Sequence, residues 1–146
     1  SPPLIMLSVG RRRGEPKDTA RNLLETREGV VHVCHRPLAE AMSATSADLP
    51  PEGDEFEHAG LGKVPSTLVR PPRIAGAPVA MECRVQQHLV PDGSTTDVFI
   101  LRVVYVHLDD AYVVDGLVDA ARLQAVGRLG GASYCDTSEV FEVSRP

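Results

Sequence analysis

Two strand-patterned runs joined by a tight turn constrain this fold more than any other feature of the sequence. Residues 80–90 and 96–108 both follow a strand pattern, and the segment between them contains Pro-Asp-Gly-Ser. Asp-Gly between two such runs is a strong signal of a β-hairpin. Two consecutive strands of this length predict a curved antiparallel sheet or a barrel.

Shorter elements are predicted around this hairpin from apolar spacing, helix caps and glycine stops. Asp18 or Thr19 is a suitable N-cap for a helix that ends near Gly29. Extended, proline-containing chain is predicted for 61–78, and a glycine-rich loop for 126–134. The remaining predicted elements are strands at 4–9, 30–34, 111–114 and 140–143, helices at 19–26, 37–42, 54–59 and 119–123, and a loop at 49–53.

Length and composition indicate one domain over residues 1–146. A hydrophobic content of 42% is enough to build a core in a chain of this length. A net charge of −5 argues against a general nucleic-acid-binding surface, and no apolar run approaches the roughly 20 residues that cross a bilayer. The three cysteines are too few and too widely spaced for a disulfide framework, so a reducing cytoplasm is the expected compartment.

Residues 8–19 join the first predicted strand to the first predicted helix through a basic loop. This loop contains two glycines, three arginines and Lys17. An exposed helix N-terminus carries unpaired amides and a positive dipole end, so a lysine and a hydroxyl beside it would complete an anion site. The alternative is a solvated basic turn with an ordinary N-cap, which local chemistry alone favours.

Four histidines are candidate metal ligands or hydrogen-bonding partners. Alternation along a strand places His32 and Cys34 on one face and His35 on the other, so these three side chains do not converge on a metal. No metal site is therefore predicted. His88 and His107 lie on the two long predicted strands, and a cross-strand surface pair is expected. The chain has neither the Gly-x-Ser-x-Gly motif of serine hydrolases nor the Gly-x-Gly-x-x-Gly motif of dinucleotide-binding dehydrogenases.

Three segments carry a resemblance when they are taken together. They are Pro-Pro-Leu-Ile-Met-Leu-Ser-Val-Gly at 2–10, followed by Lys-Asp-Thr at 17–19; Ala-Met-Ser-Ala-Thr-Ser at 41–46; and Gly-Arg-Leu-Gly-Gly at 127–131, followed by Tyr134. In this order and spacing they resemble the flavin reductase-like family of FMN-binding split β-barrels, over nearly the whole chain. The resemblance implies a mainly β fold with flanking helices (β/α+β), a Greek-key split β-barrel, and a homodimer with FMN at its interface.

The resemblance also implies which residues bind the cofactor. Lys17 and Thr19 would contact the flavin phosphate, with Asp18 capping the helix, and the backbone of 8–10 would line the groove. Ser43 stands where the family has asparagine, so one amide contact is shortened or lost. No catalytic side chain is implied, because the hydride passes between two cofactors. The predicted cofactor-binding residues are Ser8, Val9, Gly10, Lys17, Asp18, Thr19, Ser43, Ala44, Thr45, Ser46, Arg128, Gly130 and Gly131.

The predicted function is that of an FMN-binding oxidoreductase that passes electrons from NAD(P)H to flavin. Two alternatives stay open: a non-enzymatic FMN-binding electron carrier, and a degenerate dimeric domain that no longer binds flavin. Family members have several strands ahead of the Pro-Pro-Leu strand, so we expect that N-terminal strands are missing from this chain. Tyr134 and Phe56 are the candidate platforms for stacking on a planar ring, or else packed side chains.

Overall fold

A computed structural model describes residues 1–47, 49–50 and 53–144. Pro51 and Glu52, in the loop predicted at 49–53, lie outside the described residues. The chain separates into two compact units, each of which is described by itself. The first unit comprises Ser1–Val31, Lys63–Arg73 and Met81–Val106, and the second comprises His32–Gly62, Ile74–Ala80 and the chain from His107 onward.

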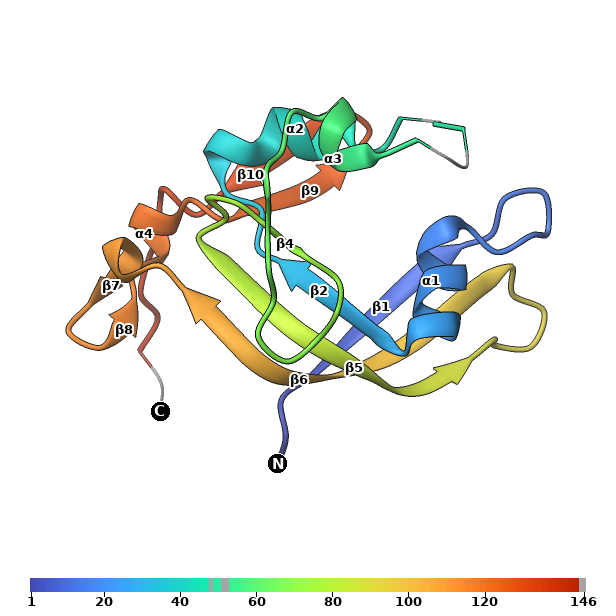
Figure 1. Ribbon diagram of the computed structural model, residues 1–146. Helices are drawn as coiled ribbons and strands as arrows, with labels where there is room; N and C mark the ends of the chain where they lie inside the picture. The colour runs from blue at the N-terminus through green and yellow to red at the C-terminus, as the bar shows by residue number, and fades with distance from the viewer. Residues whose placement is uncertain (48, 51–52, 145–146) are drawn as a thin grey trace. The chain divides into compact units, whose positions relative to one another are not determined.

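A four-stranded antiparallel sheet with the order β1-β6-β5-β2 is the main β structure (Figure 1). Its strands are β1 (Leu4–Gly10), β2 (Glu28–His32), β5 (Val79–Leu89) and β6 (Thr96–Leu108). In the β1–β6 ladder, Leu4 lies opposite Arg102 and Gly10 lies opposite Thr96. The predicted hairpin and the predicted first strand are therefore confirmed to within one residue, whereas the strand predicted at 30–34 begins and ends two residues earlier.

The core of the first unit is built from alternate residues of the strands and one face of α1 (Asp18–Thr26). Phe99, Leu101 and Val103 are alternate residues of β6, so one face of this strand is buried, as strand geometry requires. The buried core residues are Val9, Ala20, Leu23, Cys83, Val85, Phe99, Leu101 and Val103. Full burial of each large apolar side chain in this set stabilises the fold by about 1.5–3 kcal/mol.

The C-terminal end of α1 differs from the prediction that Gly29 stops the helix. The helix ends at Thr26, and Arg27 takes the left-handed backbone conformation with φ 59°. The Arg27 N–H donates to the Leu23 carbonyl at 3.1 Å, which closes the last turn. Gly29 lies instead in β2, where a Cβ atom would come within 3.0 Å of the Leu23 side chain. The glycine is thus explained by a close approach and not by a helix stop.

A buried carboxylate fixes the segment between β3 (Lys63–Val64) and β4 (Arg73–Ile74). Glu82, on β5, has no solvent exposure. Its carboxylate oxygens accept hydrogen bonds from three successive amides: Thr67 and Leu68 at 2.6 Å each, and Val69 at 3.2 Å. This single side chain therefore holds the turn of 67–69 against the sheet of the first unit.

The second unit consists of short helices and two-stranded ribbons. Asp54 and Asp119 cap two of its helices by accepting from the amides of Phe56 and Arg122 at 2.9 and 3.0 Å. Both caps follow from side chains that offer a local acceptor to the first helical turn. The elements are a 3-10 helix (Arg36–Leu38), α2 (Ala39–Ala44), α3 (Glu55–His58), a second 3-10 helix (Asp110–Tyr112), β7 (Val113–Val114), β8 (Leu117–Val118), α4 (Ala120–Leu123), β9 (Val126–Gly130) and β10 (Ser133–Asp136).

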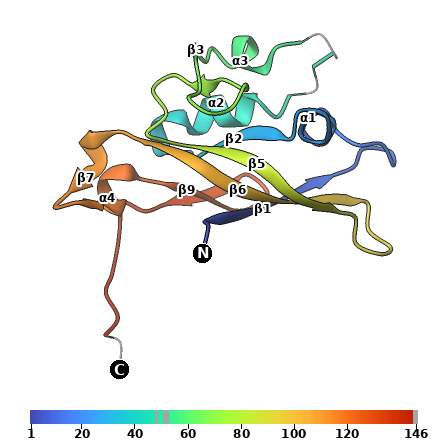
Figure 2. The same ribbon diagram turned by 60° about the horizontal axis from the view of Figure 1, so that its bottom comes forward.

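Three predictions for the second unit were wrong or incomplete. The glycine-rich segment at 126–134 is not a loop but the β9–β10 hairpin, with Gly131 left-handed in its turn. The strand predicted at 111–114 is confirmed only for Val113–Val114, because 111–112 belong to a 3-10 helix. Asp115-Gly116 makes a tight β7–β8 turn with φ values of 51° and 79°. Residues 140–143 form no strand: Figure 2 shows an extended tail after β10, on which Phe141 is 88% exposed.

His35 is a buried titratable residue of the second unit, with 6% of its surface exposed. Its ring meets Tyr112 edge to face, with the ring centroids 6.1 Å apart. Its Nδ1 atom has no hydrogen-bond partner among the described residues. Burial lowers the pKa of the His35 imidazole, because the charged form loses its hydration.

Replacing Glu82 by glutamine should lower the free energy of unfolding by about 1.5–3 kcal/mol, the usual range for hydrogen bonds to a charged group. The amide keeps one acceptor oxygen but turns an N–H₂ group toward backbone N–H donors. Urea unfolding measures the change, with Glu25→Gln on the exposed face of α1 as the matched control. Equal stability of the two variants would contradict the role assigned to Glu82.

The His35 environment predicts a loss of stability in mild acid. The unfolded chain gains its proton near the ordinary imidazole pKa of about 6.5, whereas the folded chain gains it at lower pH. The unfolded state therefore binds more protons between these two pKa values, so stability falls as the pH drops through that interval. The pKa of Asp97, lowered by its bond to Arg11, keeps that carboxyl ionised in this range.

Urea unfolding at about pH 7.5 and about pH 5.5 checks this expectation. His35→Phe keeps an aromatic edge contact with Tyr112 and removes the titrating group, so it should lose less stability between the two pH values than the parent chain does. His58→Phe, at an exposed position of α3, is the control and should retain the full pH dependence. An unchanged pH dependence in His35→Phe would assign the effect to another group.

Candidate functional site

The connection from β1 to α1 is a short hairpin-like turn in the first unit. Arg12 and Glu15 exchange two backbone hydrogen bonds, each of 2.9 Å. Between them, Arg13 and Gly14 both adopt left-handed backbone, with φ values of 53° and 86°. Positive φ at both central positions is typical of the tight turns of β-hairpins. The Arg13 side chain is thereby exposed at the tip of the turn.

The N-terminus of α1 follows this turn and lacks a side-chain cap. Lys17 occupies the N-cap position in extended backbone, so the prediction that Asp18 or Thr19 caps the helix was wrong. Asp18 instead accepts a hydrogen bond from Arg21, one turn along the same helix. Lys17 and Thr19 are both exposed. The first-turn amides, an ammonium group and a hydroxyl are therefore available together, which is the donor set that a phosphate requires.

The three residues predicted in β1 differ in exposure. Ser8 and Gly10 are exposed, whereas the Val9 side chain is buried in the core of the first unit. A Cβ atom added to Gly10 would meet nothing within 4 Å. Gly10 thus leaves open space at the end of β1, next to the turn that leads to Lys17.

Arg11, the first arginine of the loop, is bound to a carboxylate of the sheet. Its guanidinium makes two hydrogen bonds to Asp97, from Nε to Oδ2 at 2.9 Å and from Nη2 to Oδ1 at 3.0 Å. His88 Nε2 lies 2.9 Å from the same Asp97 Oδ1, so His88 pairs with Asp97 and not with His107 as predicted. The hydrogen bonds from Arg11 lower the pKa of the Asp97 carboxyl, and Asp97 raises that of Arg11.

A groove of about 660 Å³ lies between α2 and the β9–β10 hairpin in the second unit. This volume is within the range of roughly 300–1,000 Å³ that small-molecule sites occupy. The side chains that give the groove its chemistry are a guanidinium, a carboxylate, a thioether, a hydroxyl, a phenol ring and a thiol, from Arg36, Glu40, Met42, Ser43, Tyr134 and Cys135. The groove can therefore hold a planar ring beside a charged group.

The predicted segment 43–46 is only partly directed to this groove. Ser43 lines it from the last turn of α2, and Ala44 ends that helix. The Thr45 hydroxyl donates to the Met42 carbonyl at 2.7 Å, and the Ser46 hydroxyl donates to the Ser43 carbonyl at 2.6 Å. The hydroxyls of Thr45 and Ser46 are thus bonded to carbonyls at the end of α2. The sequence alone did not indicate these two hydrogen bonds.

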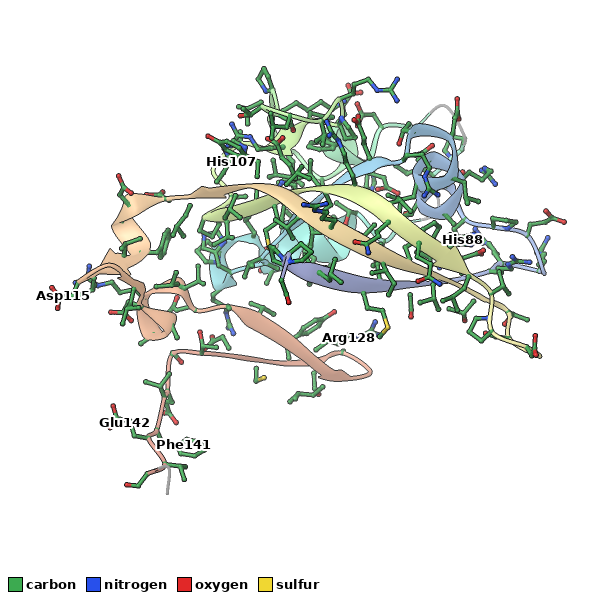
Figure 3. The ribbon with its side chains drawn as sticks, turned by 90° about the horizontal axis from the view of Figure 1, so that it is seen from below. His88, His107, Asp115, Arg128, Phe141 and Glu142 are labelled. Carbon is green, nitrogen blue, oxygen red and sulfur yellow. The ribbon has the colours of Figure 1, made fainter. Side chains whose placement is uncertain are left out.

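The predicted segment around Arg128 forms its own turn. Arg128 Nη2 donates to the Gly131 carbonyl at 3.2 Å, across the end of the β9–β10 hairpin. Figure 3 labels Arg128 on this hairpin. Gly130 pairs with Ser133, and Tyr134 lies opposite Arg128 in the ladder. This register carries Tyr134 to the groove, so the hairpin contributes an aromatic ring to it.

The structure divides the predicted cofactor residues between the two units. Residues 8–10 and 17–19 belong to the first unit, whereas 43–46 and 128–131 belong to the second. Sequence reasoning missed Asp97, although a signal existed: Asp97 has the same strand parity as Phe99 and Leu101. A charge in a buried row indicates a specific partner, and here that partner is Arg11.

The histidines near Cys34 have structural contacts. His32 Nε2 accepts a hydrogen bond from the Ile74 amide at 3.0 Å. Within residues 1–47, 49–50 and 53–144, no group of three or more His, Cys, Asp or Glu side chains is placed to hold a metal ion. In the same ranges no helix has the length and apolar content that crossing a membrane requires.

Comparisons of sequence and of structure with known proteins both point to one protein family. The family profile described as "Flavin reductase like domain" matches residues 1–123. A protein of Halalkalibacterium halodurans is 42% identical, over 99% of this chain and 72% of that protein.

Two solved structures illustrate the similarity in fold. Nitrilotriacetate monooxygenase component B from Bacillus cereus superimposes with a TM-score of 0.90 and 36% identity, over 97% of this chain and 72% of that one. A protein with a split barrel domain from Shewanella frigidimarina gives a TM-score of 0.86 at 22% identity, over 99% of this chain and 72% of that one. The predicted split β-barrel fold is confirmed, and the chain belongs to the flavin reductase-like family.

Proposed function

We propose that this protein is an FMN-binding oxidoreductase that passes electrons from NAD(P)H to flavin. The observation that supports it most is the uncapped N-terminus of α1, where free first-turn amides adjoin the exposed Lys17 and Thr19. Family membership supports a flavin as the ligand, and a phosphate-binding helix start favours FMN over unphosphorylated riboflavin.

Each group at this helix start has a distinct role in the proposal. The Lys17 ammonium supplies a point charge that pairs with a phosphate oxygen, and the Thr19 hydroxyl donates a neutral hydrogen bond. The first-turn amides complete the shell around the anion. Asp18 does not compete for this position, because its carboxylate is bonded to Arg21.

The groove of the second unit, taken by itself, is a separate candidate site with room for a planar ring. The Tyr134 ring and the Met42 side chain offer polarisable surfaces on which such a ring can pack. Arg36 Nη1 lies 3.6 Å from Asp136 Oδ2, which is a long ion pair. Other donors of the Arg36 guanidinium can therefore bind a ligand. FMN, when bound, supplies the hydride chemistry.

A homodimer in the cytoplasm, built from one domain per chain, completes the proposal. The tail after β10 presents Val140, Phe141 and Val143 to solvent, as Figure 3 shows for Phe141. Exposed apolar surface supports association with a second copy.

Visible absorption spectra distinguish this proposal from its alternatives. We expect the purified protein to gain a bound-flavin band with FMN, and this band to bleach on addition of NADH or NADPH under anaerobic conditions. A stable flavin band that neither nicotinamide bleaches would identify an electron carrier instead. A protein that retains no FMN after gel filtration would contradict the proposal and favour a domain that has lost flavin binding.

Lys17→Ala should weaken FMN binding about tenfold or more, because it removes a charge-assisted contact to the phosphate. Riboflavin, which has no phosphate, should bind the variant and the parent chain equally. Fluorescence titration of both flavins measures the two dissociation constants. Lys63→Ala, on β3, is the matched control, and an FMN affinity that is the same in both variants would place the phosphate elsewhere.

A further inference from the structure

Asp97 is a charged residue in the buried row of β6. Its side chain is 1% exposed, and it shares the strand parity of Phe99 and Leu101, which are fully buried. A carboxylate at such a position is tolerated only when it is fully paired, because burial removes its hydration. The contacts of Asp97 therefore indicate what this charge holds in place.

Both oxygens of Asp97 are occupied by side chains from other segments of the first unit. Arg11 binds them in a two-pronged arrangement, with Nε and Nη2 at 2.9 and 3.0 Å. His88 approaches Oδ1 at 2.9 Å, and its ring stacks on Phe99 with the centroids 4.7 Å apart. Figure 3 labels His88 near the end of β5 that leads into the hairpin turn.

Arg11 is held by its backbone as well as by its side chain. Its N–H donates to the Thr95 carbonyl at 2.8 Å, which extends the contact between β1 and β6 beyond Gly10. The turn of 12–15 begins at the next residue. At the far end of that turn, Arg21 Nη1 donates to the Pro16 carbonyl at 2.8 Å. The chain that precedes Lys17 is thus fastened on both sides of the turn.

This pairing commits the Nε and Nη2 groups of Arg11 to Asp97 and so gives Arg11 a structural role. If the guanidinium turned toward a ligand, the Asp97 carboxylate would stay buried without its main partner, which is strongly unfavourable. A lysine could supply the charge at this position but not the planar fork that satisfies both oxygens. The chemistry therefore requires an arginine whose role is to set the position of the turn.

We propose that Asp97 and Arg11, braced by His88, are positioning residues that hold the 12–15 turn so that Lys17 and the start of α1 can receive the FMN phosphate. This inference rests on the proposed function, because it concerns the same phosphate site. In this proposal the three side chains affect ligand selectivity without contacting the ligand.

Arg11→Lys tests the proposal because it keeps the charge and removes the fork. The matched control is Arg102→Lys, an exposed arginine of β6 that faces Leu4 of β1 in the ladder. The readout is the ratio of FMN affinity to riboflavin affinity, together with amide hydrogen exchange of residues 12–15 and 17. We expect Arg11→Lys to lose about tenfold in this ratio and to exchange faster at these amides, and Arg102→Lys to change neither.

Each alternative result has a defined meaning. An unchanged ratio in Arg11→Lys, or an equal loss of affinity for both flavins, overturns the positioning role. If the parent chain does not prefer FMN over riboflavin, the phosphate site itself is wrong. In that case the amide hydrogen exchange of residues 12–15 and 17 decides whether Arg11 and Asp97 hold the turn. Equal exchange in Arg11→Lys and Arg102→Lys overturns this role, whereas faster exchange in Arg11→Lys alone supports it.

A second variant pair guards against misfolding of Arg11→Lys. Asp97→Asn keeps the size of the side chain and removes the charge that orients Arg11, with Asp92→Asn in the exposed hairpin turn as its control. Urea unfolding first establishes that each variant is folded. The same loss of FMN preference in Asp97→Asn supports the proposal, and its retention overturns it.

Discussion

The packing of the first unit depends on β6, which forms ladders with both β1 and β5. Its alternate residues supply the centre of the core through Phe99, Leu101 and Val103. The same alternation places Asp97 in the buried row, one step before the apolar residues begin. Because a strand has a period of two, the register that buries the core also fixes where this carboxylate must find its partner. The register of β6 therefore determines both its backbone pairing and the ion pair between Asp97 and Arg11.

The elements that the sequence predicted well are those determined by local chemistry. Asp-Gly between two strand patterns specified the long hairpin, and Asp54 and Asp119 capped short helices as such residues do. Gly29 shows where local reasoning fails. A Cβ atom at position 29 would come 3.0 Å from the Leu23 side chain of α1, a contact that favours glycine and that the sequence pattern did not indicate. A close approach between two elements has no local signature in one sequence.

The candidate site shows the same division between local and tertiary information. The resemblance predicted a phosphate site at the start of α1, and the structure shows which groups there are bonded within the protein. Asp18 is taken by Arg21, and the hydroxyls of Thr45 and Ser46 are taken by the end of α2. Polar side chains near a helix end compete for backbone groups before they can serve a ligand. Only the folded geometry decides which of them remain available.

The cations around the β1–α1 turn illustrate how burial separates chemically similar residues into different roles. Arg11 is partly buried and satisfies a carboxylate that cannot be left alone, so its charge is already neutralised within the protein. Lys17 is exposed beyond the turn, where a charge has few protein partners and can pair with a ligand at little desolvation cost. A rigid buried pair and an exposed charge in the same short segment give the loop both a fixed geometry and a free binding group. The proposed anion site therefore uses both residues, Arg11 to fix the turn and Lys17 to pair with the ligand.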